Sequence, residues 1–111
     1  MRKMYIAVLD EAPDYMVPTL VAHSAINAHR CFEGSPQYDD WLLTSFKKVV
    51  VRVSRKEFEK IATRHDCWKG HENTICEGLP SCLVVMPMAP HEIPPLLTFA
   101  KLWKPKDYPI D

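Results

Sequence analysis

The chain has 111 residues, of which 47% are hydrophobic and 25% are charged, and its 14 basic residues balance its 14 acidic ones. This length predicts one compact domain, 1–111, with a core over about residues 3–103. No apolar run approaches the roughly 20 residues of a membrane helix, and the apolar run near the N-terminus is too short for a signal peptide. We therefore expect a cytoplasmic protein without a membrane partner, and zero net charge argues against general affinity for long nucleic acids.

The first part of the chain predicts a strand, a helix and a loop. Residues 4–9, MYIAVL, are a short apolar run that leads into a turn. Pro18 suits the first turn of a helix and Gly34 suits its end, so a helix is expected over about residues 18–33. Residues 33–40, EGSPQYDD, predict a loop, and the next six residues fit either a helical turn or an extended segment.

The middle of the chain has the clearest patterns. Residues 47–53, KKVVVRV, are β-branched and predict a strand. Ser54 and Glu57 have the spacing of a capping box, in which each side chain bonds a backbone N–H at the start of a helix. We therefore expect a helix over residues 54–65.

The last part of the chain predicts two strands and a helix. A short strand should precede residues 80–87, PSCLVVMP, which form a second apolar strand. The final helix is expected over about residues 94–102, with both of its prolines in the first turn. Strands that are apolar throughout are typical of a sheet covered on both faces, so the fold class is predicted to be an α/β three-layer domain. Ligands of such domains bind beyond the carboxyl ends of the parallel strands.

Several segments resemble type 2 peptidyl-tRNA hydrolases, over about residues 3–103: KMYIAVL, AHSAINAH, KKVVVRVSRKEFEKI, GLPSCLVVMP and FAKLW. The resemblance implies a three-layer α/β/α sandwich with a mixed four-stranded sheet of order 2-1-4-3, in which strand 3 is antiparallel, and a homodimer. Members of that family hydrolyse the ester that joins a peptide to the terminal adenosine of a tRNA, and they use no metal or other cofactor. A phage origin would fit so short a version of an enzyme fold.

The functional positions of the family are poorly retained. His23 matches the helix histidine of the family, but Met16 stands where the family has its essential lysine. Lys69 and Asn73 stand at the places of the catalytic carboxylate and a threonine, and Ser81 keeps a strand hydroxyl. The resemblance therefore supports the fold more strongly than the activity.

The candidate catalytic residues are His23 or His71 as a general base and Lys69 as a cation that stabilises a developing oxyanion. Imidazole titrates near neutral pH and can take a proton from water or from an attacking hydroxyl, and a nearby carboxylate could orient it. The candidate ligand-binding residues come from the first loop, the first helix and the segment after the short strand: Asp10, Glu11, Asp14, Tyr15, Thr19, Asn27, Glu72, Asn73, Thr74 and Ser81.

Two functions fit these residues. One is hydrolysis of an ester or phosphodiester in a tRNA end or in a small linear or cyclic nucleotide signal. The other is binding without cleavage, in which the protein sequesters a nucleotide signal; zero net charge and the missing lysine favour this alternative.

A zinc site is a further possibility, because HDCWKGHENTIC at residues 65–76 contains His65, Cys67, His71 and Cys76. Tetrahedral zinc accepts such ligands. The spacing is unusual, however, and a segment that spans a helix end and a strand would scatter the four side chains. We therefore expect a site without a metal, and reduced cysteines.

Basic residues gather around the second predicted strand: Lys47, Lys48, Arg52, Arg55 and Lys56. Alternation along a strand would send them to different sides, so we expect solvated edge residues rather than an RNA-binding surface. Trp103 is expected to close the core, and residues 104–111 form a short C-terminal tail.

Overall fold

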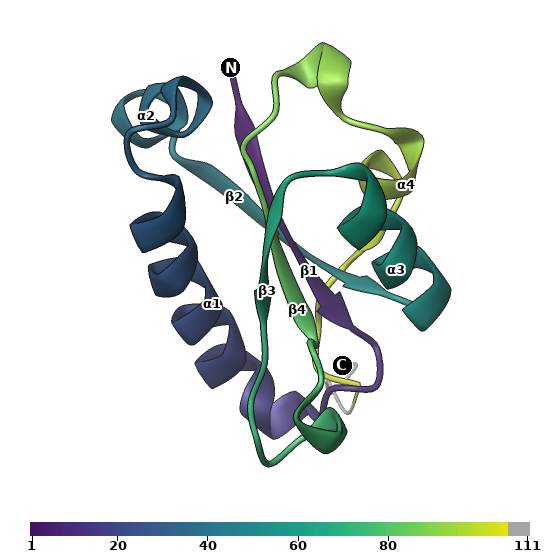
Figure 1. Ribbon diagram of the computed structural model, residues 1–111. Coiled ribbons are helices and arrows are strands. Elements are labelled where there is room, and N and C mark those ends of the chain that lie inside the picture. Colours follow the sequence, from purple (N-terminus) through teal and green to yellow (C-terminus); the bar gives the residue numbers. More distant parts are fainter. Residues whose placement is uncertain (107–111) are drawn as a thin grey trace, which may run out of the picture.

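The computed structural model describes residues 1–106, in which a mixed sheet lies between two layers of helices (Figure 1). The strands are β1 (Lys3–Leu9), β2 (Lys47–Val53), β3 (Cys67–Gly70), β4 (Cys82–Val85) and β5 (Lys101–Leu102). The α-helices are α1 (Val17–Phe32), α2 (Pro36–Leu43), α3 (Arg55–Arg64) and α4 (Pro95–Thr98), and the 3-10 turns are η1 (Asp14–Met16), η2 (Cys76–Gly78) and η3 (Pro90–Glu92). No helix within these residues is both long and apolar enough to cross a membrane.

The strands of the sheet lie in the order β3-β4-β1-β2-β5. β1 and β2 are parallel, whereas β4 is antiparallel to β1 and β5 is antiparallel to β2. Because β3 is antiparallel to β4, it runs in the same direction as β1. The carboxyl ends of β1, β2 and β3 therefore lie at one end of the sheet, which is where ligand binding is predicted.

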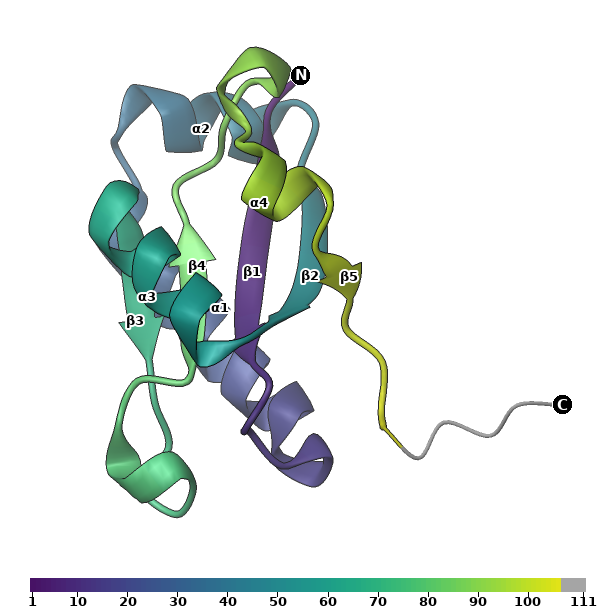
Figure 2. The same cartoon turned by 90° about the vertical axis from the view of Figure 1, so that its right-hand side faces the viewer.

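The sheet has a separate apolar core on each face, and β1 contributes to both. Met4, Ile6 and Val8 pack on the side of α1 and α2. Tyr5, Ala7 and Leu9 pack on the side of α3 and α4. Neighbouring residues of a strand face opposite ways, so burial on both faces explains why β1 is apolar throughout. The α/β class predicted from this pattern is confirmed. Figure 2 shows the strands side by side in the order β3-β4-β1-β2-β5, with α3 and α4 in front of the sheet and α1 behind it.

Four predicted elements are present with nearly the expected bounds: β1, α1, β2 and α3. The capping box of α3 is complete, because the Ser54 hydroxyl accepts from the Glu57 N–H and the Glu57 carboxylate accepts from the Ser54 N–H. Here the local signals and the tertiary packing agree.

Two local predictions were wrong. The expected loop at 33–40 contains the start of α2, because Pro36 occupies the first helical turn and the helix buries Tyr38 and Trp41 against α1 and the sheet. The expected helix at 94–102 ends at Thr98, and the chain then forms β5 on the free edge of β2. The strand expected at 80–87 is shorter, since β4 covers only Cys82–Val85.

The sheet implied by the family resemblance also needs correction. It has five strands rather than four, so the order 2-1-4-3 covers only part of it. The expected single antiparallel strand was strand 3, but β4 and β5 are the strands that run against β1 and β2. The difference lies in the pairing of β4 with β1, which is antiparallel; β3, being antiparallel to β4, then runs in the same direction as β1. Most of the expected C-terminal tail, residues 107–111, lies outside the described residues.

Candidate functional site

The loop after β1 and the 71–81 loop after β3 lie together around the start of α1 (Figure 1). Ile75, in the loop between β3 and β4, belongs to the same buried cluster as Ala12 in the first loop and as Val17 and Leu20 in α1. Burial of these side chains holds the two loops against the helix. The candidate residues of the first loop, the first helix and the 71–81 loop therefore lie at the same end of the molecule, although their partners differ.

Gly70 sets how closely β3 approaches α1. A Cβ atom placed on Gly70 would lie 1.9 Å from Ser24 Oγ and 2.8 Å from Ser24 Cβ. Ser24 is buried in the middle of α1, and its hydroxyl donates to the Leu20 carbonyl at 2.7 Å. Only glycine fits at this crossing, which brings the segment after β3 beside the polar side chains of α1.

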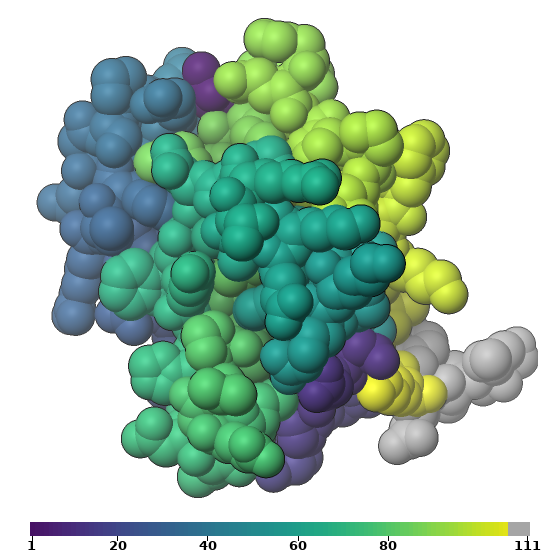
Figure 3. Space-filling view, turned by 45° about the vertical axis from the view of Figure 1, so that its right-hand side comes forward, coloured from purple at the N-terminus to yellow at the C-terminus, as the bar shows by residue number. Residues whose placement is uncertain are grey.

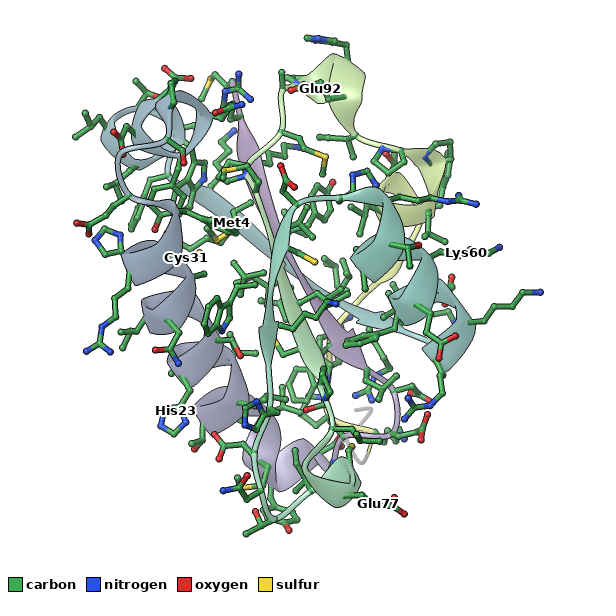
Figure 4. The ribbon with its side chains drawn as sticks, viewed as in Figure 1. Met4, His23, Cys31, Lys60, Glu77 and Glu92 are labelled. Carbon is green, nitrogen blue, oxygen red and sulfur yellow. The ribbon has the colours of Figure 1, made fainter. Side chains whose placement is uncertain are left out.

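His23 on α1 and Glu72 in the loop after β3 form a close pair. The distance between His23 Nδ1 and Glu72 Oε1 is 2.5 Å. The His23 side chain is 61% exposed, whereas that of Glu72 is 17% exposed. Figure 4 shows His23 on the outer side of α1, in the half of the molecule that contains these loops.

The chemistry of this pair follows from its donors and acceptors. An ionised carboxylate can only accept hydrogen bonds, so His23 Nδ1 must carry the proton that is shared with Glu72. In the neutral ring, Nε2 then has a free lone pair, and it makes no hydrogen bond with residues 1–106. The pair therefore presents an oriented proton acceptor to solvent.

The two aspartates of the first loop have a different partner. Asp10 and Asp14 each lie 3.3 Å from the guanidinium of Arg52, at the end of β2. The Arg52 side chain is only 15% exposed, and its guanidinium carbon lies 5.3 Å from the centre of the Trp103 ring. Arg52 thus pairs with both aspartates, and Lys106 lies 3.6 Å from Asp10 as a second cation, so these carboxylates are poorly suited to bind a metal cation or to serve as a base.

Glu11 is paired as well. Its two carboxylate oxygens accept from Arg55 Nε and from one terminal nitrogen at 2.9 and 3.0 Å. These hydrogen bonds lower the pKa of Glu11 and raise the pKa of Arg55. In Figure 3 the purple first loop lies between the teal α3 and the yellow residues at the end of the described chain.

A shallow depression of about 450 Å³ lies beside the first loop, lined by residues 11–15 and Lys106. Lys106 donates to the Asp10 carbonyl at 3.0 Å and lies 3.6 Å from the Asp10 carboxylate. Tyr15 is 77% exposed, which leaves its ring available for stacking.

Lys69 does not join His23. Along β3, Trp68 packs on the α1 side of the sheet and Cys67 packs on the α3 side. Alternation along the strand places Lys69 on the same side as Cys67, away from α1. His71 is exposed and makes no side-chain hydrogen bond within residues 1–106. Of the three predicted catalytic residues, only His23 has a polar side-chain partner among residues 1–106.

The remaining predicted residues are dispersed around the pair. Thr19 is exposed one helical turn before His23, and Asn27 is half-buried one turn after it. Asn73 and Thr74 are exposed in the 71–81 loop. Ser81 is fully buried, and its hydroxyl has no hydrogen-bond partner in the described chain. Ser81 therefore cannot contact a ligand on the surface as predicted.

The four residues of the zinc hypothesis do not form a site. In the part of the chain that the structure describes, no three His, Cys, Asp or Glu side chains come close enough to hold a metal ion. Burial raises the pKa of Cys67 and, together with the charge of Glu11, that of Cys76; burial also raises the pKa of Cys82 to about 12. These thiols stay protonated at neutral pH, which makes them poor ligands and nucleophiles.

Sequence reasoning missed the two arginines as partners of the first loop. Arg52 interrupts an otherwise apolar stretch at the end of β2, and a lone arginine in such a strand is a signal for a paired charge. Nothing in the local sequence marks the pairing of Arg55 with Glu11. Glu72 was one of several carboxylates that could orient a histidine, and the structure selects it for His23.

Comparison with known proteins does not assign the chain to a family. No protein-family model matches it, and no curated protein matches it with significant similarity. The relationship to type 2 peptidyl-tRNA hydrolases stays a prediction, and function must be inferred from the site itself.

Proposed function

We propose that this protein acts on a nucleotide-containing ligand and hydrolyses an ester or phosphodiester bond in it, with His23 as the general base. The observation that supports this proposal is the 2.5 Å contact between His23 Nδ1 and Glu72, combined with the exposure of the histidine ring. A carboxylate in this position fixes the tautomer of the imidazole and stabilises the imidazolium that forms when the base accepts a proton.

The proposed reaction uses His23 twice. Nε2 takes a proton from a water molecule or from a hydroxyl of the ligand as that oxygen attacks the carbonyl carbon or the phosphorus. When the bond to the leaving oxygen breaks, the imidazolium returns the proton to that oxygen. Glu72 stays ionised throughout. Proton transfer by a positioned base of this kind accelerates a reaction by about 10²–10⁴-fold.

The ligand class rests on the depression beside the first loop and on the family resemblance. Tyr15 offers an exposed ring for a base to stack on, and Lys106 adds a cation beside the same depression. A tRNA end or a small linear or cyclic nucleotide would use both features. We also propose that the protein acts as a homodimer.

Binding without cleavage is the second candidate, and the position of Lys69 favours it. Lys69 was the expected stabiliser of a developing negative charge, but alternation places it on the other side of the sheet from His23. No salt bridge joins the His23–Glu72 pair to a lysine or arginine of residues 1–106. A site without an electrophilic group could hold a nucleotide and leave it intact.

Incubation with peptidyl-tRNA and with a panel of linear and cyclic nucleotides, followed by chromatography, tests both candidates. We expect product from at least one substrate, and a rate about 10²–10⁴-fold lower for His23→Gln. His91→Gln is the matched control, because His91 is also exposed but lies in η3, remote from this pair, and it should keep the full rate.

The other outcomes separate the candidates. Intact nucleotide recovered from the heated protein would exclude hydrolysis and support sequestration. No product and no thermal shift with any nucleotide would exclude both. Product formed at the same rate by His23→Gln would keep the activity but remove the proposed base.

A further inference from the structure

We infer that a hollow at the opposite end of the sheet from His23 binds a free α-amino acid with an apolar side chain. The hollow has a volume of about 330 Å³, a size typical of small-molecule sites. Its wall comes from the residue before β1, the start of α2, the end of α3, the chain after β4, and η3. Figure 4 shows Glu92, which belongs to this wall, and His23 towards opposite ends of the molecule.

The buried part of the wall is apolar. Val85 at the end of β4 is buried, as are Pro87 and Met88 just after it, and Met86 is half-buried. A methionine side chain is flexible and polarizable, so a surface that contains two of them can adapt to apolar groups of different shape. The ligand should therefore have an apolar part that covers these side chains.

The rest of the wall carries charges of both signs. Arg2 and Arg64 provide two cations, and Asp66 and Glu92 provide two anions. Neither Arg64 nor Asp66 forms a salt bridge within residues 1–106, so both can pair with a ligand. A ligand of one charge would be attracted by one pair of residues and repelled by the other, whereas a zwitterion can contact both.

Arg2 and Glu92 lie side by side in the wall, and other parts of the chain orient them. Arg2 Nη1 lies 3.3 Å from Glu92 Oε1 and donates to the Pro87 carbonyl at 3.2 Å, while Arg2 Nε lies 3.4 Å from the Asp40 carboxylate. Glu92 Oε1 also accepts from the Ala89 N–H at 2.8 Å, and this hydrogen bond lowers the pKa of the Glu92 carboxyl. Both side chains are therefore charged at neutral pH and positioned before a ligand binds.

Each member of this pair has one atom that makes no hydrogen bond in the described chain: Nη2 of Arg2 and Oε2 of Glu92. A guanidinium nitrogen donates well to a carboxylate, and an ionised carboxylate can only accept. Nη2 can thus donate to the carboxylate of an amino acid, and Oε2 can accept from its ammonium group. In an α-amino acid these two groups are attached to one carbon, so they require neighbouring partners of opposite charge, as this ion pair provides.

Isothermal titration calorimetry of the full chain with leucine tests the site. We expect saturable binding of leucine. Two analogues keep the apolar side chain but lack one charged group each: 4-methylpentanoate has no ammonium group, and 3-methylbutylamine has no carboxylate. Each analogue should bind at least about tenfold more weakly than leucine, because it loses charge-assisted hydrogen bonds.

Glu92→Gln tests the proposed ammonium partner. Glutamine keeps an oxygen that can accept from the Ala89 N–H, but it removes the negative charge. We expect at least about tenfold weaker binding of leucine and no weaker binding of 4-methylpentanoate, whereas a collapsed site would lose both ligands. Glu59→Gln is the matched control, because Glu59 is exposed on α3, lies outside the hollow and forms no salt bridge within residues 1–106.

Three results would overturn the inference. The first is no saturable binding of leucine, methionine or phenylalanine. The second is equal affinity for leucine and for either analogue, and the third is equal weakening of leucine binding by Glu92→Gln and Glu59→Gln. None of these results bears on hydrolysis at His23, because the two sites share no residue.

Discussion

The carboxylates at the carboxyl ends of the strands fall into two groups with different partners. Those of the first loop are bound to arginines: Asp10 and Asp14 to Arg52, and Glu11 to Arg55. Glu72, in the 71–81 loop, is bound to an exposed histidine. An arginine keeps its charge at any ordinary pH, whereas a histidine can gain and lose a proton near neutrality. The first group therefore stabilises the fold, and the second is suited to chemistry.

The comparison also shows why residue type alone did not locate the site. Four acidic residues were candidates, and all four lie near one another in the folded chain. Their availability depends on the residue that each one contacts, and those contacts join segments about 40 or more positions apart, such as Glu11 with Arg55 and His23 with Glu72.

The largest effect on stability is expected from Gly70→Ala, which changes the end of β3, two residues before Glu72. Its Cβ would lie 1.9 Å from Ser24 Oγ, so β3 would have to move away from α1. We expect a loss of about 2–3 kcal/mol in the free energy of unfolding, as is typical of overpacking, measured by urea denaturation.

A double variant gives the control for this prediction. Ser24→Gly removes both atoms that the new methyl group would meet, at a cost of about 1 kcal/mol for glycine in a helix. Gly70→Ala in that background should cost much less than it does alone. Equal losses in both backgrounds would show that the close approach of β3 to α1 is not the cause.

A smaller loss in the free energy of unfolding is expected from Arg52→Met, which removes the cation that pairs with the aspartates of the first loop. The change leaves Asp10 and Asp14 close together without their shared cation, and it removes the contact with Trp103. Because the aspartates are partly exposed, we expect a loss of only about 1–2 kcal/mol at pH 7, below that of a fully buried pair. Urea denaturation measures it.

Arg55→Met is the matched comparison for Arg52→Met. Its pair with Glu11 is open to solvent, so the loss should be smaller and should shrink further in high salt. A larger loss for Arg55→Met than for Arg52→Met would contradict the assignment of the structural role to Arg52.

The smallest effect is the pH dependence that Glu11 adds. Its hydrogen bonds with Arg55 lower its pKa in the folded chain below the ordinary value of 4.5. The unfolded chain therefore takes up this proton first as the pH falls, so the stabilisation is present above about pH 4.5 and is lost below it. Urea midpoints at several pH values between 6 and 3 should show the wild type losing its advantage over Glu11→Gln. A constant difference across that range would argue against the pairing.

Elements that are marked by a local sequence pattern were predicted correctly, whereas elements that depend on contacts with distant residues were not. The capping box of Ser54 and Glu57 and the apolar run of β1 are local patterns, and they predicted α3 and the two-sided sheet correctly. β5 was missed because its pairing with β2 is decided by a strand about 50 residues away. The side of the sheet that Lys69 occupies depends on the register of β3, which a four-residue strand does not reveal.

The candidate site could also be predicted only in part. His23 could be selected because a histidine in the polar stripe of a helix is a candidate base, and the end of the sheet could be predicted from the parallel strands. The role of Gly70 could not be predicted, since the glycine matters only through Ser24 on a separate element. The buried position of Ser81 was equally hidden, because burial at the start of β4 depends on the packing of the loops around it.

The most direct test of the central claim is the tautomer of His23, measured from the nitrogen chemical shifts of the imidazole ring by NMR. If Glu72 orients His23 as a base, the neutral ring should carry its proton on Nδ1 and leave Nε2 unprotonated, and Glu72→Ala should abolish this preference. His91, in the same spectra, serves as an internal reference without such a partner. A neutral His23 with its proton on Nε2 would contradict the account, because the exposed nitrogen could then accept no proton.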